Sequence, residues 1–156
     1  LAAAYAALVN GGTMVQPTLL RRPDTAPGPR VISPETSRIM RSLFRQVVTR
    51  GTASLGEVAG YGVGGKTGTA DKPNPQGGYY DDRVVATFAG AFPMNDPRYV
   101  IIVTMDEPQE TVGGVERRTA GWTVVPVAAE MVRRIAPVMG MRPQDPAVID
   151  AELRLR

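Results

Sequence analysis

The sequence predicts an α+β fold, in which an antiparallel sheet is flanked by helices. Two strongly apolar runs, 84–92 and 99–105, are joined by the turn-forming segment 93–98, which has the length of a hairpin connection. Apolar residues recur at helical spacing after Ser33, and again near Pro126. Strands joined by short turns pair antiparallel. The helices each have one apolar face, so they are expected to cover this sheet.

Alanine-rich residues 1–9 predict the last turns of a helix. The helix is expected to end at Asn10-Gly11-Gly12, because these residues tolerate the left-handed backbone of a helix terminus. Residues 13–20 stay apolar and alternate loosely, which predicts a short extended segment. Four prolines and glycines within 21–30 predict a surface loop.

A longer helix is predicted between Ser33 and Gly51. Ser33 can cap its start, Pro34 fits its first position, and Glu35 lies near the positive end of the helix dipole. Its apolar side chains are expected to face the core rather than a ligand, and they are Ile39, Met40, Leu43, Phe44, Val47 and Val48.

Another amphipathic helix is predicted to begin near Pro126, because proline is tolerated in a first turn. This helix is expected to pack on the sheet through Val127, Met131, Val132 and Ile135. Residues 137–156 contain prolines at 137, 143 and 146, so we expect a C-terminal tail of undetermined order after a domain spanning 1–136.

Residues 61–70 predict a third strand, in which four glycines lie among β-tolerant residues. The next eight residues, 71–78, are rich in proline and glycine and predict a turn or loop. Residues 106–121 are expected to form another loop. The three predicted strands would then lie side by side in antiparallel order.

The composition limits the chemistry available to the chain. At 156 residues, with 43% hydrophobic and 21% charged residues, it is expected to form one globular domain or a large part of one. The sequence contains neither histidine nor cysteine, which removes imidazole-based triads, thiol nucleophiles, disulfides and nearly every zinc site. Catalysis would have to use lysine, hydroxyls or carboxylates, and we expect no metal or cofactor.

A net charge of +3 and a pI near 9.6 are compatible with a nucleic-acid surface, with basic residues at Arg21, Arg22, Arg30 and Arg133-Arg134. However, these residues are not interleaved with aromatics, and fifteen acidic residues are mixed among them. We therefore expect a mildly basic solvated face and no nucleic-acid partner. The chain begins within an apolar helical pattern, so it is expected to be part of a longer protein with any membrane anchor upstream.

Residues 60–67 match the pattern of a phosphate-binding loop, in which glycine, four residues and Gly-Lys-Thr follow one another. Such a site needs a buried strand before the loop and a helix after it, because the phosphates bind the N-terminal amides of that helix. Residues 56–59 do not read as a buried strand, and Pro73 and Pro75 arrive before two helical turns could form. The sequence therefore disfavours a nucleotide site.

The same lysine can instead lie in an edge strand. An extended Lys66-Thr67-Gly68-Thr69 points Lys66 and Gly68 to one side and Thr67 and Thr69 to the other, and leaves edge amides free for a ligand strand. Gly68 would let another backbone come close. This arrangement suits an anionic, peptide-like ligand. In a purely structural alternative, the glycines mark a bulge beside a helix and Lys66 is merely solvated.

Lys66-Thr67-Gly68, followed by Thr69-Ala70, resembles the third signature of the penicillin-binding protein and serine β-lactamase superfamily. Similar patterns occur in the same order at 1–12, 47–53, 64–70, Phe88-Ala89-Gly90 and Asp106-Glu107-Pro108. Over residues 1–136 the chain resembles the C-terminal part of the transpeptidase domain of class B penicillin-binding proteins, of the cell-division type. The resemblance implies part of the penicillin-binding protein/serine β-lactamase-like fold.

The resemblance also implies a serine acyl-enzyme mechanism. A serine attacks the penultimate D-alanine carbonyl of a peptidoglycan stem peptide, D-alanine leaves, and an amine of a neighbouring stem takes the acyl group. β-Lactams acylate the same serine. Neither Ser-x-x-Lys nor Ser-x-Asn occurs in this sequence. The nucleophile is therefore expected before residue 1, and this chain alone is expected to be inactive.

Within that mechanism the resemblance implies a role for each residue of the motif. Lys66 would sustain positive potential in the cleft, and the Thr67 and Thr69 hydroxyls would receive the terminal carboxylate. Gly68 would let the substrate backbone lie against the strand. The Thr69 amide would supply half of an oxyanion hole, in which one donor is often worth roughly 3 kcal/mol. Lys66 and Thr69 are thus the expected catalytic residues.

Two aromatic residues also have expected roles. Tyr79 is a candidate wall for a drug side chain, although Arg83 stands where a second aromatic is expected, and Trp122 is expected to pack. The implied partners are stem peptides, β-lactams, the missing N-terminal part of the domain, and divisome membrane proteins including a septal glycosyltransferase. The implied location is the periplasmic side of the bacterial inner membrane. A noncatalytic relative and a swapped dimer are alternatives.

Overall fold

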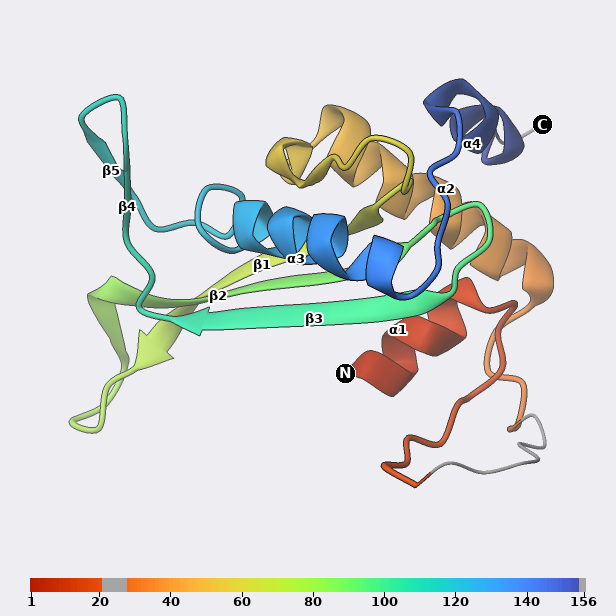
Figure 1. The fold of residues 1–156 in the computed structure, drawn as a ribbon. Helices are drawn as coiled ribbons and strands as arrows, with labels where there is room; N and C mark the ends of the chain where they lie inside the picture. The colour runs from red at the N-terminus through yellow and green to blue at the C-terminus, as the bar shows by residue number, and fades with distance from the viewer. Residues whose placement is uncertain (21–27, 155–156) are drawn as a thin grey trace.

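The computed structural model describes residues 1–20 and 28–154. The loop predicted over 21–30 lies mostly outside this part, as do Arg21 and Arg22. The predicted α+β class is confirmed, with helices on either side of a sheet (Figure 1). The helices are α1 (Ala2–Val9), α2 (Pro34–Arg50), the 3-10 helix η1 (Ser54–Gly56), α3 (Val124–Val138) and α4 (Pro146–Glu152). The strands are β1 (Gly64–Pro73), β2 (Tyr79–Phe92), β3 (Tyr99–Asp106), β4 (Glu110–Val112) and β5 (Val115–Arg117).

The main sheet is antiparallel, in the order β1-β2-β3, as expected from the three predicted strands. Phe88 stands at its centre, opposite Thr67 on β1 and Val103 on β3. Within the part of the chain that the structure describes, the outer edges of β1 and β3 have no strand partner. The extended segment predicted over 13–20 forms only an isolated bridge, from Thr13 to Arg30.

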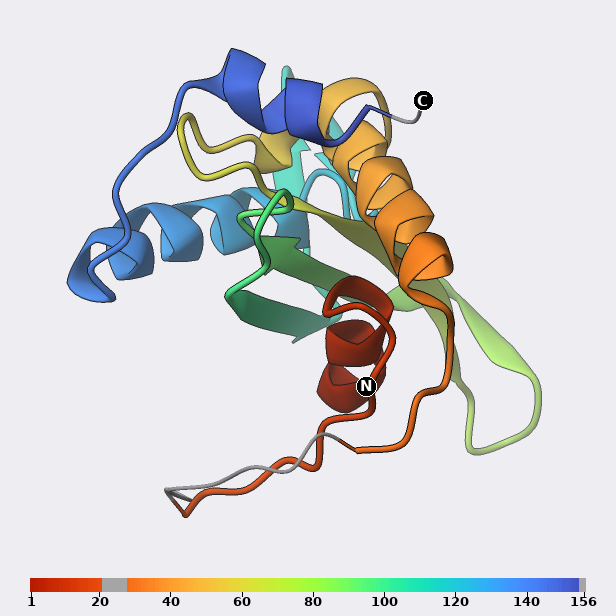
Figure 2. The same ribbon diagram turned by 90° about the vertical axis from the view of Figure 1, so that its right-hand side faces the viewer.

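The sheet carries a separate apolar core on each face. On one face α3 packs on β2 and β3, around the fully buried Phe88. On the other face α1 packs on the same strands, in a cluster that includes Phe44, Met94 and Ile149. Figure 2 shows α3 and α1 separated by the sheet. The two helices therefore fix the sheet from both sides.

Helix α2 begins as its sequence predicts. The Ser33 hydroxyl accepts a hydrogen bond from the Thr36 amide at 3.0 Å, and Pro34 occupies the first helical turn. The predicted apolar face is partly wrong, because Leu43 is 45% exposed whereas the neighbouring Arg45 is only 5% exposed. Arg45 can be buried because each nitrogen of its guanidinium donates a hydrogen bond to another part of the chain.

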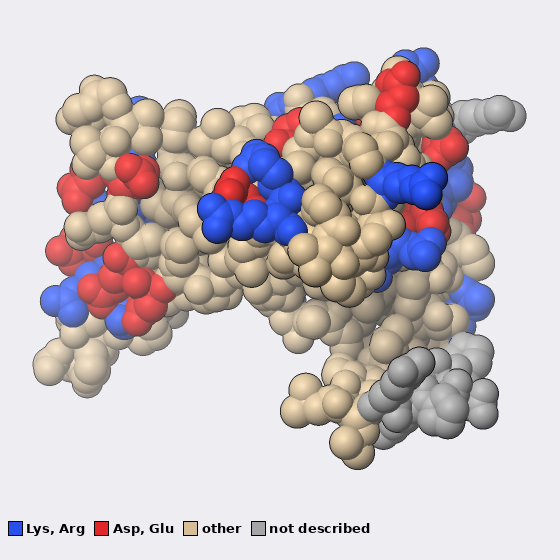
Figure 3. All heavy atoms as spheres, in the orientation of Figure 1, with Lys and Arg blue, Asp and Glu red and all other residues tan. Residues whose placement is uncertain are grey.

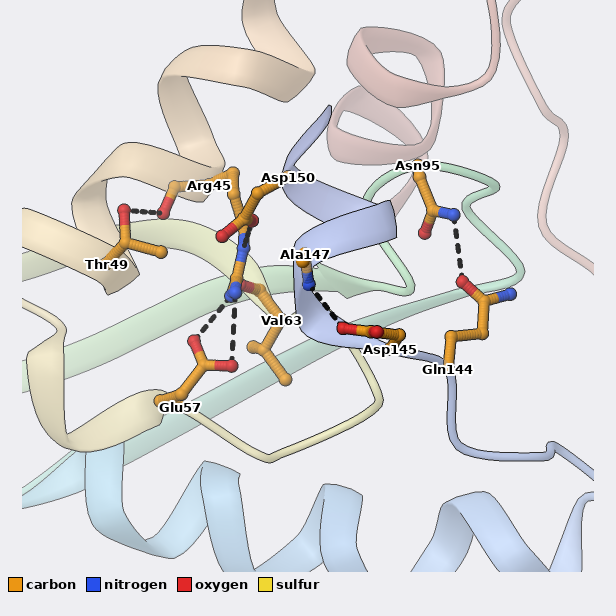
Figure 4. Close-up of polar contacts among 9 residues, drawn as sticks. All are labelled: Arg45, Thr49, Glu57, Val63, Asn95, Gln144, Asp145, Ala147 and Asp150. Carbon is orange, nitrogen blue, oxygen red and sulfur yellow. Dashed lines mark hydrogen bonds and ion pairs between the residues drawn. The ribbon is translucent and has the colours of Figure 1, made fainter. Parts of the chain in front are cut away.

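The Arg45 guanidinium joins three segments that are distant in sequence (Figure 4). Its Nε donates to Asp150 of α4 at 2.8 Å, and its terminal nitrogens donate to Glu57 at 2.5 and 3.1 Å. One of these nitrogens also donates to the Val63 carbonyl at 2.9 Å, immediately before β1. This network fixes the start of β1 against α2 and α4.

The hairpin between β1 and β2 is longer than predicted. The expected loop at 71–78 is wrong for its first residues, since β1 continues to Pro73 and β2 already starts at Tyr79. A proline is tolerated there because an edge strand needs no amide donor on its open side. The Lys72 ammonium bonds Asp106 at 2.8 Å and Glu107 at 2.6 Å, and these hydrogen bonds raise the pKa of Lys72 above its ordinary value.

Helix α3 packs on the sheet as predicted, but largely through a different face. Its buried side chains are Val124, Val125, Ala128, Ala129, Val132 and Ala136. Of the predicted face only Val132 is buried, while Val127, Met131 and Ile135 are 37–38% exposed. Small residues let the helix approach the strands closely, and the larger apolar residues therefore point away.

Three short elements lie in segments that were expected to be loop or tail. Within 106–121, β4 and β5 pair through Gly113-Gly114, whose φ angles of +59° and +76° favour glycine. Within 137–154, α4 begins at the Asp145 cap and buries Ile149 completely. The C-terminal segment is thus attached to the core beside Phe44.

Candidate active site

The motif Lys66-Thr67-Gly68-Thr69 lies within β1, at the edge of the sheet. Lys66 pairs with Ala89 and Gly68 with Thr87 on the face that carries α1, whereas Thr67 and Thr69 lie on the face of α3. This is the alternation that an extended motif predicts. The phosphate-loop hypothesis is wrong, because the chain stays extended from Lys66 to Pro73 and no helix follows the lysine.

The glycines of β1 differ in what a side chain at each position would contact. A Cβ atom on Gly64 would lie 2.5 Å from the Met94 methyl group, and one on Gly65 would lie 2.4 Å from the Ala89 carbonyl oxygen. At Gly68 the nearest atom would be the Thr87 carbonyl oxygen, at 4.0 Å. Close packing therefore explains the first two glycines, as in the structural alternative, but nothing within the described chain requires Gly68.

The Lys66 ammonium is available to a ligand. Its Nζ donates to the Thr67 carbonyl at 2.6 Å, and no ion pair of residues 1–20 or 28–154 includes Lys66. By contrast Lys72, on the same strand, is held by two carboxylates. Among the described residues, therefore, no carboxylate compensates the positive charge of Lys66, which lies on the same face of β1 as the open Gly68.

The hydroxyls of Thr67 and Thr69 are both held by neighbouring segments. The Thr67 Oγ1 lies 2.7 Å from the Oγ1 of Thr52, in the turn after α2. The Thr69 Oγ1 accepts a hydrogen bond from the Ala120 amide at 3.0 Å, in the loop before α3. Each hydroxyl is therefore oriented by a group outside the motif.

A pocket of about 420 Å³ opens beside these two threonines. It also contains Leu55 and Trp122, whose side chains are 47% and 37% exposed. The Arg117 guanidinium lies 5.0 Å from the centre of the Trp122 ring. The pocket combines hydroxyls with apolar walls, and it is lined by Gly51, Thr52, Ser54, Leu55, Thr67, Thr69, Thr119, Ala120, Gly121 and Trp122.

Tyr79 does not line this pocket. It begins β2 opposite Pro73, at the outer end of the hairpin, and is 67% exposed. Its suggested role as a wall for a drug side chain stays a prediction.

Sequence reasoning missed the contributions of Thr52 and Ala120, although Gly51-Thr52-Ala53 belonged to the family-like pattern at 47–53.

The surface carries mixed charges. On the face shown in Figure 3, acidic and basic side chains lie next to one another instead of forming a continuous basic area. Arg133 and Arg134, which were considered for nucleic-acid binding, both pair with Glu130. Among the described residues, no group of acidic side chains is arranged to hold a metal ion, and no helix is both long and apolar enough to cross a membrane.

Residues 1–129 match the family described as the penicillin binding protein transpeptidase domain. The chain belongs to this family. Penicillin-binding protein PbpB of Mycolicibacterium smegmatis is 38% identical over 172 residues, which cover 97% of this chain and 26% of that protein. The probable peptidoglycan D,D-transpeptidase FtsI of Caulobacter vibrioides is also 38% identical, over 91% of this chain and 26% of that protein.

Solved transpeptidase structures are similar as well. The transpeptidase domain of Burkholderia pseudomallei penicillin-binding protein 3 superposes with a TM-score of 0.79 at 37% identity, covering 92% of this chain and 43% of that one. Penicillin-binding protein 3 of Mycobacterium tuberculosis, in complex with aztreonam, gives a TM-score of 0.74 at 31% identity, covering 92% of this chain and 35% of that one. The family resemblance seen in the sequence is confirmed. The chain spans about a quarter of the length of these curated relatives.

Proposed function

We propose that this chain is the C-terminal part of a serine D,D-transpeptidase that cross-links peptidoglycan stem peptides during septal wall synthesis and binds β-lactams. The observation that carries the proposal is the open edge strand β1 of a family member. Its Lys66, which has no carboxylate partner among the described residues, and its unobstructed Gly68 lie on one face, and the Thr67 and Thr69 hydroxyls lie on the other. A cation, hydroxyl donors and edge amides suit a peptide that ends in a carboxylate.

The proposed reaction divides the work between this chain and an upstream segment. The upstream serine Oγ bonds to the penultimate D-alanine carbonyl carbon, the bond to the terminal D-alanine breaks, and an amine of a neighbouring stem then displaces the serine. Thr67 and Thr69 hold the terminal carboxylate, while Lys66 supplies positive potential. The Thr69 amide stabilises the tetrahedral oxyanion together with the amide of the serine.

Family membership supports the remaining parts of the proposal. The protein is anchored in the bacterial inner membrane by a single upstream helix and presents this domain to the periplasm. It acts with other divisome proteins, including a septal glycosyltransferase. Residues 1–136 form the C-terminal portion of the transpeptidase domain, and 137–156 form a C-terminal tail. This chain alone is inactive, because Ser-x-x-Lys is absent from its sequence.

Covalent labelling of the full-length protein by fluorescent penicillin tests this function. We expect wild-type protein to be labelled and Lys66→Ala to be labelled roughly 10- to 100-fold more slowly, as for loss of a charged hydrogen-bond donor. Lys72→Ala is the matched control, since this lysine on the same strand already has two carboxylate partners. Wild-type protein that is not labelled would indicate a noncatalytic relative. Equal labelling rates of Lys66→Ala and Lys72→Ala would show that Lys66 has no role in the site.

A further inference from the structure

The turn after α2 places a hydroxyl against the carboxylate-binding edge. Thr52 lies 15 residues before Thr67 in the sequence, yet their Oγ1 atoms are 2.7 Å apart. Within the described ranges, the Thr52 hydroxyl has no other hydrogen-bond partner. A lone contact between two exposed hydroxyls adds little stability on its own. Its place beside the motif points to another use.

The backbone around Thr52 is fixed on both sides. The amides of Gly51 and Ala53 both donate to the Val47 carbonyl at 3.1 Å, at the end of α2. The Ala53 side chain is completely buried. A Cβ atom on Gly121 would lie only 2.5 Å from the Thr52 carbonyl oxygen, so the loop before α3 closes on the same turn. Thr52 therefore presents its hydroxyl to β1 from a rigid support.

The direction of the hydrogen bonds follows from the ligand. A threonine hydroxyl has one proton, and a carboxylate can only accept. At Thr69 the Ala120 amide donates to Oγ1, so the Thr69 proton remains available. At Thr67 the proton becomes available only when Thr52 is the donor. A hydroxyl that accepts a hydrogen bond also becomes a stronger donor.

We propose that Thr52 is a positioning residue, which donates to the Thr67 hydroxyl and thereby turns the Thr67 proton toward the carboxylate of the bound ligand. The inference rests on the proposed function and deepens it. Thr52 acts through Thr67, because its single hydroxyl proton is directed to Thr67 and not to the ligand. The two hydroxyls of the motif then share one pattern, since each accepts from the protein and donates to the ligand.

The test compares the acylation rate of the full-length protein by benzylpenicillin and by its methyl ester, which lacks the carboxylate. We expect Thr52→Val to slow acylation by benzylpenicillin roughly tenfold, the equivalent of one hydrogen bond, and to leave the ester unaffected. Thr52→Ser keeps the hydroxyl and should react like the wild type. Thr104→Val is the matched control, because it removes one partner of a threonine pair of similar length, 3.1 Å, that joins β2 to β3 and does not include β1.

A double-mutant cycle makes the proposed coupling explicit. Thr52→Val combined with Thr67→Val should react with benzylpenicillin no more slowly than Thr67→Val alone. Equal losses for acid and ester, an unchanged rate for Thr52→Val, or a serine variant as slow as valine would each overturn the inference. These outcomes require a reactive wild-type protein. A wild type that neither ligand acylates would instead overturn the proposed function and this inference with it.

Discussion

Along β1 the three glycines of the motif region differ in what surrounds them. Gly64 and Gly65 lie against a methyl group and a carbonyl, whereas Gly68 faces open space on the side of Lys66. The placement of Lys66 and Thr67 on opposite faces of the strand could be predicted, because it depends only on the two-residue period of a strand. The partners of Thr67 and Thr69 could not, since they lie 15 and 51 residues away and meet the motif only after folding.

The first prediction separates packing from ligand binding at these glycines. In the full-length protein, Gly68→Val should change the free energy of unfolding by less than about 0.5 kcal/mol, because no neighbour obstructs it. It should nevertheless slow penicillin acylation strongly, because the branched side chain would occupy the ligand's path. Denaturant melts and labelling rates measure the two effects.

Gly65→Val is the contrasting variant. Its side chain would collide with the Ala89 carbonyl, so unfolding should become easier by about 1–3 kcal/mol. An equally destabilised Gly68 variant would mean that this glycine serves packing, and full-rate acylation of Gly68→Val would place the ligand elsewhere.

Among the elements, sequence patterns predicted those whose signals are local. Helix α2 has its Ser33 cap and β3 its continuous apolar run, and both formed as expected. The buried face of α3 was missed because the sheet selects the small side chains of Ala128 and Ala136 over the larger Met131. Which side chains are buried depends on how closely the helix approaches the sheet. The sequence of the helix alone does not determine that distance.

Helix α4 supplies the second prediction. Ile149 is fully buried against Phe44 and Met94, so Ile149→Ala should lower the free energy of unfolding by roughly 2–4 kcal/mol. Val148→Ala is the matched control, because that neighbour is 50% exposed. Chemical denaturation of the full-length protein measures both. Equal, small effects would show that α4 is a detachable tail.

The Arg45 network leads to a third prediction. Arg45→Met should destabilise the protein by roughly 1–3 kcal/mol, because the Val63 carbonyl loses its donor and two carboxylates lose their partner. The cost is limited because Glu57 and Asp150 stay partly hydrated, with side chains 39% and 43% exposed. Arg38→Met is the control, since that ion pair with Glu35 lies on the surface. Equal stability of both variants would contradict the role of the network.

At the scale of the whole molecule, the described part leaves apolar surface uncovered. On α3 the side chains of Val127, Met131 and Ile135 are more than a third exposed, and Val138 is 84% exposed. The outer edge of β3 is also unpaired within the described residues. Stable domains rarely leave large apolar surfaces or long strand edges exposed to solvent. We infer that the rest of the transpeptidase domain covers this surface.

A fourth prediction follows for residues 1–156 produced alone. The isolated chain should self-associate and bind a hydrophobic dye such as ANS, whereas the full-length protein should bind less dye per molecule. Light scattering and dye fluorescence measure these properties. A monodisperse isolated chain without dye binding would show that its apolar surface needs no cover.

The proposed function places one wall of the active site in this chain and the nucleophile upstream of it. Peptide mapping by mass spectrometry, after the full-length protein reacts with benzylpenicillin, tests it most directly. We predict a single penicilloyl adduct on a serine before residue 1, in a Ser-x-x-Lys sequence, with slower formation in Lys66→Ala. An adduct on any residue of 1–156, or none at all, would contradict the account.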